Sequence, residues 1–278
     1  MEDLLQCDLC HHRCALGPGA TGFCRARKND RGRIVSVSYG LVTSLALDPI
    51  EKKPLACYKP GTRILSVGTF GCNFRCPFCQ NHHISMAGLG DSPGLEEISP
   101  QELAAKAGEL APMGNIGLAF TYNEPLVGFE FVRDTAALVK GRGLDTVIVT
   151  NGCISPARFT ELLPLVDAMN IDLKAFSPEF YTRISGSLET VKANVALAAE
   201  GCHLELTCLI IPGENDSDRE MDALCGFVAS LSPEIPLHIT RFFPRYRYAR
   251  KEATPVGTLR RLKGVAEKRL TRVFVGNV

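Results

Sequence analysis

Three cysteines in one short segment are the residues of this sequence best suited to chemistry. Cys72, Cys76 and Cys79 have the spacing C-x3-C-x2-C and follow an apolar run that predicts a buried strand at 64–70. Thiolates are the soft ligands that iron–sulfur clusters require. Three cysteines bind three irons of a cubane and leave the fourth open to another ligand. The spacing therefore predicts a [4Fe–4S] cluster with an open iron, in preference to a zinc knuckle or unliganded thiols.

Polar residues recur where later apolar strands are expected to end. The segments Thr121-Tyr122-Asn123-Glu124-Pro125, Val149-Thr150-Asn151-Gly152 and Asn170-Ile171-Asp172-Leu173-Lys174 each follow or end such a strand. Each alone also fits an ordinary strand-ending turn. Because parallel strands bring their C-terminal ends to one rim, we expect these groups to lie together, close to the cluster.

The rim segments belong to a regular alternation of strands and helices. The expected strands are rich in apolar and β-branched residues, as in a parallel sheet covered by helices. Their ranges are 64–70, 116–120, 146–149, 167–173, 204–211, 237–240 and 272–275, with helices at 101–110, 127–140, 156–163, 189–200, 219–231 and 258–270. Ser99, Pro100 and Glu102 are the capping signature of the first helix. This order predicts an α/β fold, a partial (β/α)6 TIM-type barrel.

The N-terminal part is a second, smaller unit rich in cysteine. Cys7, Cys10, Cys14 and Cys24 offer four soft ligands within one short segment. They fit tetrahedral zinc, an auxiliary iron–sulfur cluster that relays electrons, or four reduced thiols without metal. Alternating residues predict a strand pair at 33–47. We expect residues 1–60 to form this cysteine-rich, metal-binding segment with its β hairpin, and residues 61–278 to form the barrel.

Composition narrows the classes of protein to consider. The chain has 278 residues, twelve cysteines and a formal net charge of +1. A near-neutral charge does not favour a nucleic-acid partner. The first residues lack an apolar leader, and no run of about 18 apolar residues predicts a membrane span. Clustered cysteines in such a chain indicate metal ligands and a cytoplasmic location.

One stretch, 241–251, is strongly basic although the whole chain is nearly neutral. It contains four arginines, one lysine, two tyrosines and two phenylalanines, and it follows the expected strand at 237–240. It should therefore border the open site. The stretch fits a solvated loop over the barrel mouth, or a surface for an acidic peptide or nucleic acid.

With Phe78 just before the third cysteine, the cluster loop resembles the signature of the radical S-adenosylmethionine (radical SAM) superfamily. From about residue 7 to residue 278, the chain resembles the AmmeMemoRadiSam system radical SAM enzymes and the related pyruvate formate-lyase activating enzymes. The carriers of this resemblance are the Cys7–Cys24 segment, 48–55 (DPIEKKPL), 71–81 (GCNFRCPFCQN), 122–125 (YNEP), 149–152 (VTNG), 167–174 (DAMNIDLK) and 211–216 (IPGEND).

The resemblance implies a set of cofactor contacts. The open iron would bind the amino and carboxylate groups of S-adenosylmethionine. From the resemblance, Asp172 and Lys174 are expected to contact the nucleotide or a nearby cation. From residue type and place, Glu124 with its polar neighbours suits the methionine ammonium, and Asn151 suits ribose or carboxylate. Further expected cofactor contacts are Phe78, Gln80, Asn123 and Thr150.

Three positions depart from the activating-enzyme pattern. Val149 stands where those enzymes have aspartate, Thr207 where they have arginine, and Tyr246 lies nearest their late histidine. These departures leave the substrate open.

The predicted activity is reductive cleavage of S-adenosylmethionine at the cluster. The resulting 5′-deoxyadenosyl radical would abstract hydrogen from a macromolecule, most simply a protein or peptide that enters through the open side of an incomplete barrel. The expected electron donor is of the flavodoxin or ferredoxin type. An RNA-modifying radical SAM enzyme and a non-enzymatic iron–sulfur electron carrier are the alternatives.

Overall fold

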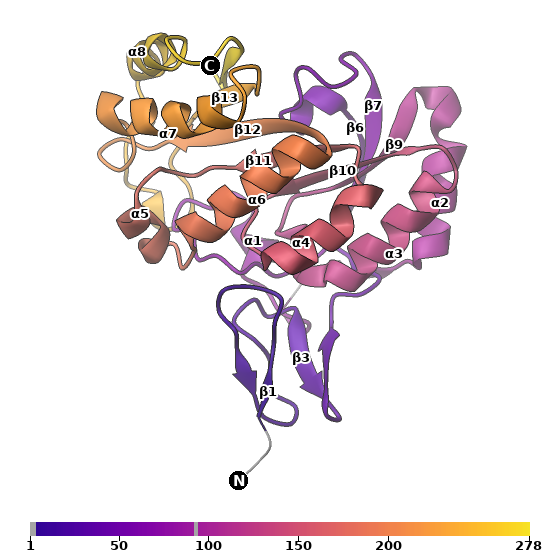
Figure 1. Cartoon of the computed structure of the whole chain (residues 1–278). Helices are drawn as coiled ribbons and strands as arrows, with labels where there is room; N and C mark the ends of the chain where they lie inside the picture. The colour runs from indigo at the N-terminus through magenta and orange to yellow at the C-terminus, as the bar shows by residue number, and fades with distance from the viewer. Residues whose placement is uncertain (1–3, 92–93) are drawn as a thin grey trace.

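The computed structural model describes residues 4–91 and 94–278 and centres on one eight-stranded sheet (Figure 1). Residues 1–3, on which the expected lack of a leader partly depends, lie outside the described residues. The strand order is β14 (Val273–Gly276), β13 (Leu237–Arg241), β12 (His203–Ile210), β11 (Ala168–Asp172), β10 (Asp145–Thr150), β9 (Asn115–Phe120), β7 (Arg63–Gly68) and β6 (Ser44–Pro49).

The sheet is parallel from β7 to β14, and only β6 at its edge is antiparallel to its neighbour. Among the described residues the two edge strands, β6 and β14, do not pair with each other. The sheet is therefore open between these edges. This arrangement confirms the predicted partial barrel.

Helices occupy the connections between successive strands. They are α2 (Pro100–Glu109), α3 (Phe129–Lys140), α4 (Pro156–Leu162), α6 (Leu188–Gly201), α7 (Asp218–Leu231) and α8 (Val256–Ala266). Figure 1 shows α3, α4 and α6 side by side in front of the sheet. The sequence did not predict the short helices α1 (His82–Ser85) and α5 (Pro178–Arg183), which follow the cluster loop and β11.

The start of α2 confirms its predicted capping. The backbone N–H of Glu102 donates to Ser99 Oγ at 3.2 Å, and the Ser99 N–H donates to Glu102 Oε2 at 2.8 Å. Pro100 is the first helical residue. These contacts satisfy two backbone donors that a helix start leaves without partners.

The predicted strand pair at 33–47 is wrong in its pairing. β4 (Arg33–Ser36) pairs with β3 (Arg27–Asp30), β5 (Leu41–Val42) pairs with β8 (Glu96–Glu97), and β6 pairs with β7. Alternation identified strands here but not their partners, because partner choice depends on packing far along the chain. The main sheet thus already begins at residue 44, while the division at residue 60 stays a prediction.

Apolar side chains close the N-terminal end of the barrel. Ile50 and Leu55, from the connection between β6 and β7, are fully buried. They pack in one cluster with residues of four neighbouring strands: Ile64, Ala119, Val147 and Ala168. A site is therefore expected at the opposite rim, where the C-terminal ends of the strands carry polar residues.

A buried carboxylate fastens the same connection to the barrel. Glu205 of β12, whose side chain is fully buried, accepts hydrogen bonds from the N–H groups of Ala56 (3.0 Å) and Cys57 (2.7 Å). His203 and His238 lie 3.0 Å and 2.7 Å from its two oxygens. Burial alone would raise the pKa of Glu205, but these donors lower it to about 2. Glu205 therefore stays ionised and ties β12 and β13 to residues 56–57.

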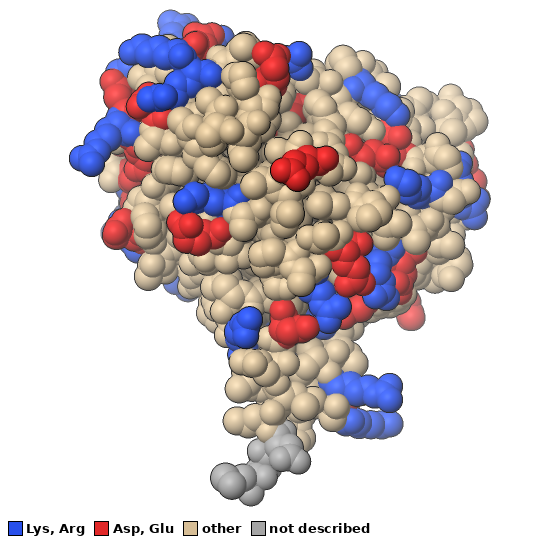
Figure 2. Space-filling model, viewed as in Figure 1, with Lys and Arg blue, Asp and Glu red and all other residues tan. Residues whose placement is uncertain are grey.

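The N-terminal lobe, residues 5–36, protrudes from the barrel and carries β1 (Leu5–Gln6), β2 (Ala15–Leu16), β3 and β4 (Figure 1). Figure 2 shows acidic and basic side chains interspersed over the visible face of the barrel, without a broad area of one sign. Within the described part of the chain, the helices are too short or too polar to cross a membrane.

Candidate active site

The cluster loop begins where β7 ends, at the C-terminal rim of the barrel. Cys76 is 6% exposed, and Cys72 and Cys79 are partly buried. Burial raises the pKa of the Cys76 thiol to about 12. The free thiol is therefore protonated at neutral pH, and iron must displace its proton on binding.

Asn123 fixes the start of the cluster loop. Its Oδ1 accepts from the Thr69 N–H at 3.0 Å, and its Nδ2 donates to Thr69 Oγ1 at 3.0 Å and to the Gly71 carbonyl at 3.1 Å. Its polar atoms thus hold the loop. Contact between Asn123 and a cofactor stays a prediction.

Glu124 is the buried centre of the rim. Its Oε1 accepts from Thr150 Oγ1 at 2.7 Å and from the Leu126 N–H at 3.0 Å, and its Oε2 accepts from the Asn151 N–H at 2.7 Å. Burial raises the pKa of Glu124 to about 7, although these donors oppose the rise. A cationic group placed beside Glu124 would favour its ionised form.

Asn151 joins the end of β10 to the cluster loop. Its Nδ2 donates to Asn73 Oδ1 at 2.8 Å and lies 3.8 Å from Cys72 Sγ. Asn73 in turn donates to the Cys153 carbonyl at 2.7 Å. Asn73 was not predicted as a separate site residue, although its place directly after Cys72 was the available signal.

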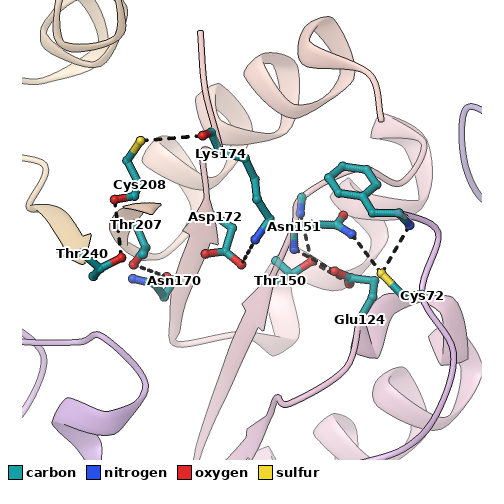
Figure 3. Close-up of polar contacts among 12 residues, drawn as sticks. Cys72, Glu124, Thr150, Asn151, Asn170, Asp172, Lys174, Thr207, Cys208 and Thr240 are labelled. Carbon is teal, nitrogen blue, oxygen red and sulfur yellow. Dashed lines mark hydrogen bonds and ion pairs between the residues drawn. The ribbon is translucent and has the colours of Figure 1, made fainter. Parts of the chain in front are cut away.

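Asp172 and Lys174 form an ion pair at the end of β11, 2.7 Å long. Figure 3 shows this pair between the Cys72–Glu124 group and the Asn170–Thr207 pair. Burial opposes the charge of Lys174, but nearby Asp172 and Cys76 outweigh it and raise the pKa of the lysine. Lys174 is therefore a permanent cation at the rim. The hydroxyl of Thr207 donates to Asn170 Oδ1 at 2.9 Å.

The basic stretch folds back onto the cluster loop. The N–H groups of Arg247 and Tyr248 donate to the Pro77 carbonyl at 3.0 and 3.2 Å. The buried ring of Phe78 lies 6.1 Å from that of Tyr248. These contacts confirm that the stretch borders the site. Gln80 is exposed, and its contact with a cofactor stays a prediction.

The residues present fit a cluster with an open iron and its nucleotide. Within residues 4–91 and 94–278, no three Cys, His, Asp or Glu side chains converge on a point that one metal ion could occupy. A cubane does not need such convergence, because each cysteine binds a different iron. Around the three thiols lie an acceptor for an ammonium group (Glu124), an amide (Asn151) and a charged pair (Asp172 with Lys174).

The structure does not support a zinc ion at Cys7, Cys10, Cys14 and Cys24. A tetrahedral zinc ion needs its sulfur ligands around one point at about 2.3 Å, and no such set occurs in the described part of the chain. A metal in this lobe stays a prediction.

The fold and the rim chemistry define a class, and comparison with known proteins identifies it. Residues 66–225, more than half of the chain, match the radical SAM superfamily. The chain belongs to that superfamily and is a radical SAM enzyme. Membership implies a [4Fe–4S] cluster and S-adenosylmethionine, and it excludes the non-enzymatic electron carrier.

Two individual proteins are similar to this chain over much of its length. It is 39% identical over 282 residues to "Uncharacterized protein MJ0808" of Methanocaldococcus jannaschii, covering 100% of this chain and 82% of that protein. It is 26% identical to pyruvate formate-lyase 1-activating enzyme of Escherichia coli, over 62% of this chain and 70% of the enzyme.

A solved structure shares the fold at low identity. SuiB of Streptococcus suis, bound to its precursor peptide SuiA, has a TM-score of 0.59 and 14% identity. The match covers 74% of this chain and 46% of SuiB.

Proposed function

We propose that this protein cleaves S-adenosylmethionine reductively and abstracts hydrogen from a protein or peptide substrate, as an AmmeMemoRadiSam system enzyme similar to the activating enzymes. When bound to Cys72, Cys76 and Cys79, the cluster would supply the electron that cleaves the bond between the sulfonium sulfur and C5′ and so yields the 5′-deoxyadenosyl radical. The observation that carries the proposal is the meeting of the three-cysteine loop with Glu124, Asn151 and Asp172 at one rim.

The rim residues would bind and orient the nucleotide. Among the described residues, Glu124 Oε2 accepts one hydrogen bond, from the Asn151 N–H, so a lone pair remains for the methionine ammonium. Thr150 holds the other oxygen of Glu124 at 2.7 Å and thereby orients the carboxylate. Asp172 and Lys174 offer an acceptor for ribose hydroxyls and a fixed positive charge.

The open side of the barrel supports a large substrate. Among the described residues the edges β6 and β14 do not pair with each other, so the sheet has an opening at its side that a closed barrel would lack. The likeness to an activating enzyme and to a SuiB–peptide complex favours a protein or peptide.

Arg245, Arg247 and Arg250 support docking of an acidic flavodoxin- or ferredoxin-type donor. All three are exposed, and no carboxylate among the described residues forms an ion pair with them. The N–H of Arg247 contacts Pro77, between two cluster cysteines. An acidic carrier bound here would approach the cluster closely, with an on-rate that salt reduces.

Deuterium transfer tests the proposed substrate class. Reduced, iron-reconstituted protein is mixed with S-adenosylmethionine and with candidate partner proteins made in deuterated medium. The expected product is 5′-deoxyadenosine that carries deuterium, detected by mass spectrometry, with unlabelled partners as the control. Deuterium transfer from labelled RNA instead of protein would contradict the proposed substrate and favour the RNA-modifying alternative.

A further inference from the structure

The four cysteines of the N-terminal lobe lie together. The N–H of Cys7 donates to the Cys14 carbonyl at 2.9 Å across the β1–β2 hairpin, and the turn of that hairpin carries Cys10. The Cys10 thiol lies close enough to those of Cys7, Cys14 and Cys24 to interact with each electrostatically. Cys7 and Cys24 are 6% and 7% exposed. Four thiols from a hairpin and the following loop thus lie near one another inside one lobe.

The lobe has little secondary structure of its own. β1 and β2 have two residues each, and β3 and β4 have four each. Its cysteines are all free thiols, so no disulfide crosslinks it. Segments this small are commonly stabilised by a bound metal.

The spacing and geometry of the thiols favour a polynuclear cluster. Cys7-x2-Cys10-x3-Cys14 contains the two spacings of the Cys72–Cys79 loop in reverse order. Like that loop, it brings thiols near one another without the convergence that a single ion needs, within the residues described. Cys24 supplies the fourth ligand that the other loop lacks. A cubane held by four cysteines has no open iron, and such a cluster transfers electrons.

The lobe is attached directly to the cluster loop. The Cys24 carbonyl accepts from the Cys72 N–H at 3.2 Å, and His12 Nε2 donates to the Asn73 carbonyl at 2.8 Å. The Arg75 guanidinium donates to the Phe23 carbonyl and lies 4.0 Å from the centre of the Phe23 ring. One backbone hydrogen bond therefore joins a cysteine of the lobe to a cysteine of the loop.

The lobe and the loop approach each other closely at Gly71. Gly71 has φ of +88°, and a Cβ at this position would lie 2.6 Å from the Cys24 carbonyl oxygen. Glycine is therefore required both for the backbone conformation and for the close approach.

We propose that Cys7, Cys10, Cys14 and Cys24 hold a second [4Fe–4S] cluster that relays electrons to the cluster loop. A flavodoxin- or ferredoxin-type protein reduces the second cluster by one electron, which gives the donor an entry point in addition to its direct approach at the basic stretch. The second cluster returns to its oxidised state as it reduces the cluster on Cys72, Cys76 and Cys79. The relay rests on the proposed function, whereas the presence of the second cluster does not.

Iron counting with a triple variant tests this assignment. Parent protein reconstituted anaerobically with iron and sulfide should bind about eight irons per chain. The variant Cys72→Ala/Cys76→Ala/Cys79→Ala should retain about four irons, and its reduced cluster should give an electron paramagnetic resonance (EPR) signal that S-adenosylmethionine does not change. Cys202→Ala, a half-buried cysteine outside both groups, is the matched control and should bind as much iron as the parent.

The outcomes separate this inference from the proposed function. A count of about four irons in the parent would overturn the second cluster. So would one zinc and no iron in the triple variant, provided that its circular dichroism spectrum matches that of the parent. The parent count needs no substitution, so misfolding of a variant cannot decide the result. An eight-iron parent that leaves S-adenosylmethionine intact would instead overturn the proposed function.

Discussion

Cys76→Ala is expected to abolish the cleavage of S-adenosylmethionine to 5′-deoxyadenosine. The substitution removes one of three thiolates, and no other cysteine of the loop can replace it. Removing residues that only support a metal ligand already costs about 10–100-fold, so loss of a ligand should exceed about 100-fold. The measurement is 5′-deoxyadenosine formed per chain under dithionite, together with bound iron.

Cys202→Ala provides the matched control for this prediction. Cys202 caps the end of α6, and its Sγ lies 3.6 Å from the Ala198 carbonyl, away from the rim. This variant should cleave as the parent does. Equal cleavage by Cys76→Ala and the parent would show that the loop does not hold the reactive cluster.

Glu124→Gln is expected to lower both stability and affinity for S-adenosylmethionine. The carboxamide keeps the shape of the side chain, but its NH2 group must face either the Asn151 N–H or the Thr150 hydroxyl and the Leu126 N–H. A buried donor left without an acceptor costs about 1–3 kcal/mol, which should appear in the free energy of unfolding by urea. Loss of the negative charge should also weaken binding of the methionine ammonium.

Glu189→Gln makes the same chemical change at the exposed start of α6, where the side chain is 77% exposed. It should alter neither property measurably. If Glu124→Gln bound the nucleotide as tightly as this control does, Glu124 would not be a nucleotide contact. Unchanged stability would contradict the hydrogen bonding around its carboxylate.

The barrel was predictable because its signals are local. Apolar runs, the Ser99–Glu102 capping box and polar residues at strand ends indicated each strand, most helices and the shared rim. The cluster loop was predictable because the two spacings between its three cysteines specify it without tertiary information. α5 was missed because its six residues are too few to show a helical period.

Contacts between distant segments could not be predicted. β6 was expected in a hairpin but joins the main sheet, since its partner β7 depends on packing. Glu205 is a charged residue inside an apolar strand, and its partners at residues 56–57 are about 150 positions away. The hydrogen bonds of Asn123 to Thr69 and Gly71 could not be read from the sequence, and its expected contact with a cofactor stays a prediction. Residue type indicated a polar rim, but only the fold separates the residues that support the loop from those that face a ligand.

One ring contact joins the basic stretch to the helix that follows the cluster loop. Tyr246 stacks on His82 with ring centres 4.3 Å apart. Val149 provides no cation ligand beside Asn151.

The central claim is that the cluster on Cys72, Cys76 and Cys79 has an open iron that binds S-adenosylmethionine. EPR of the dithionite-reduced protein, before and after addition of S-adenosylmethionine, tests it most directly. The measurement is best made on the Cys10→Ala variant as well as the parent, so that signals from the two groups of cysteines can be told apart. We predict a changed spectrum on addition of the nucleotide. An iron-loaded protein whose spectrum stays unchanged at saturating S-adenosylmethionine would contradict the claim.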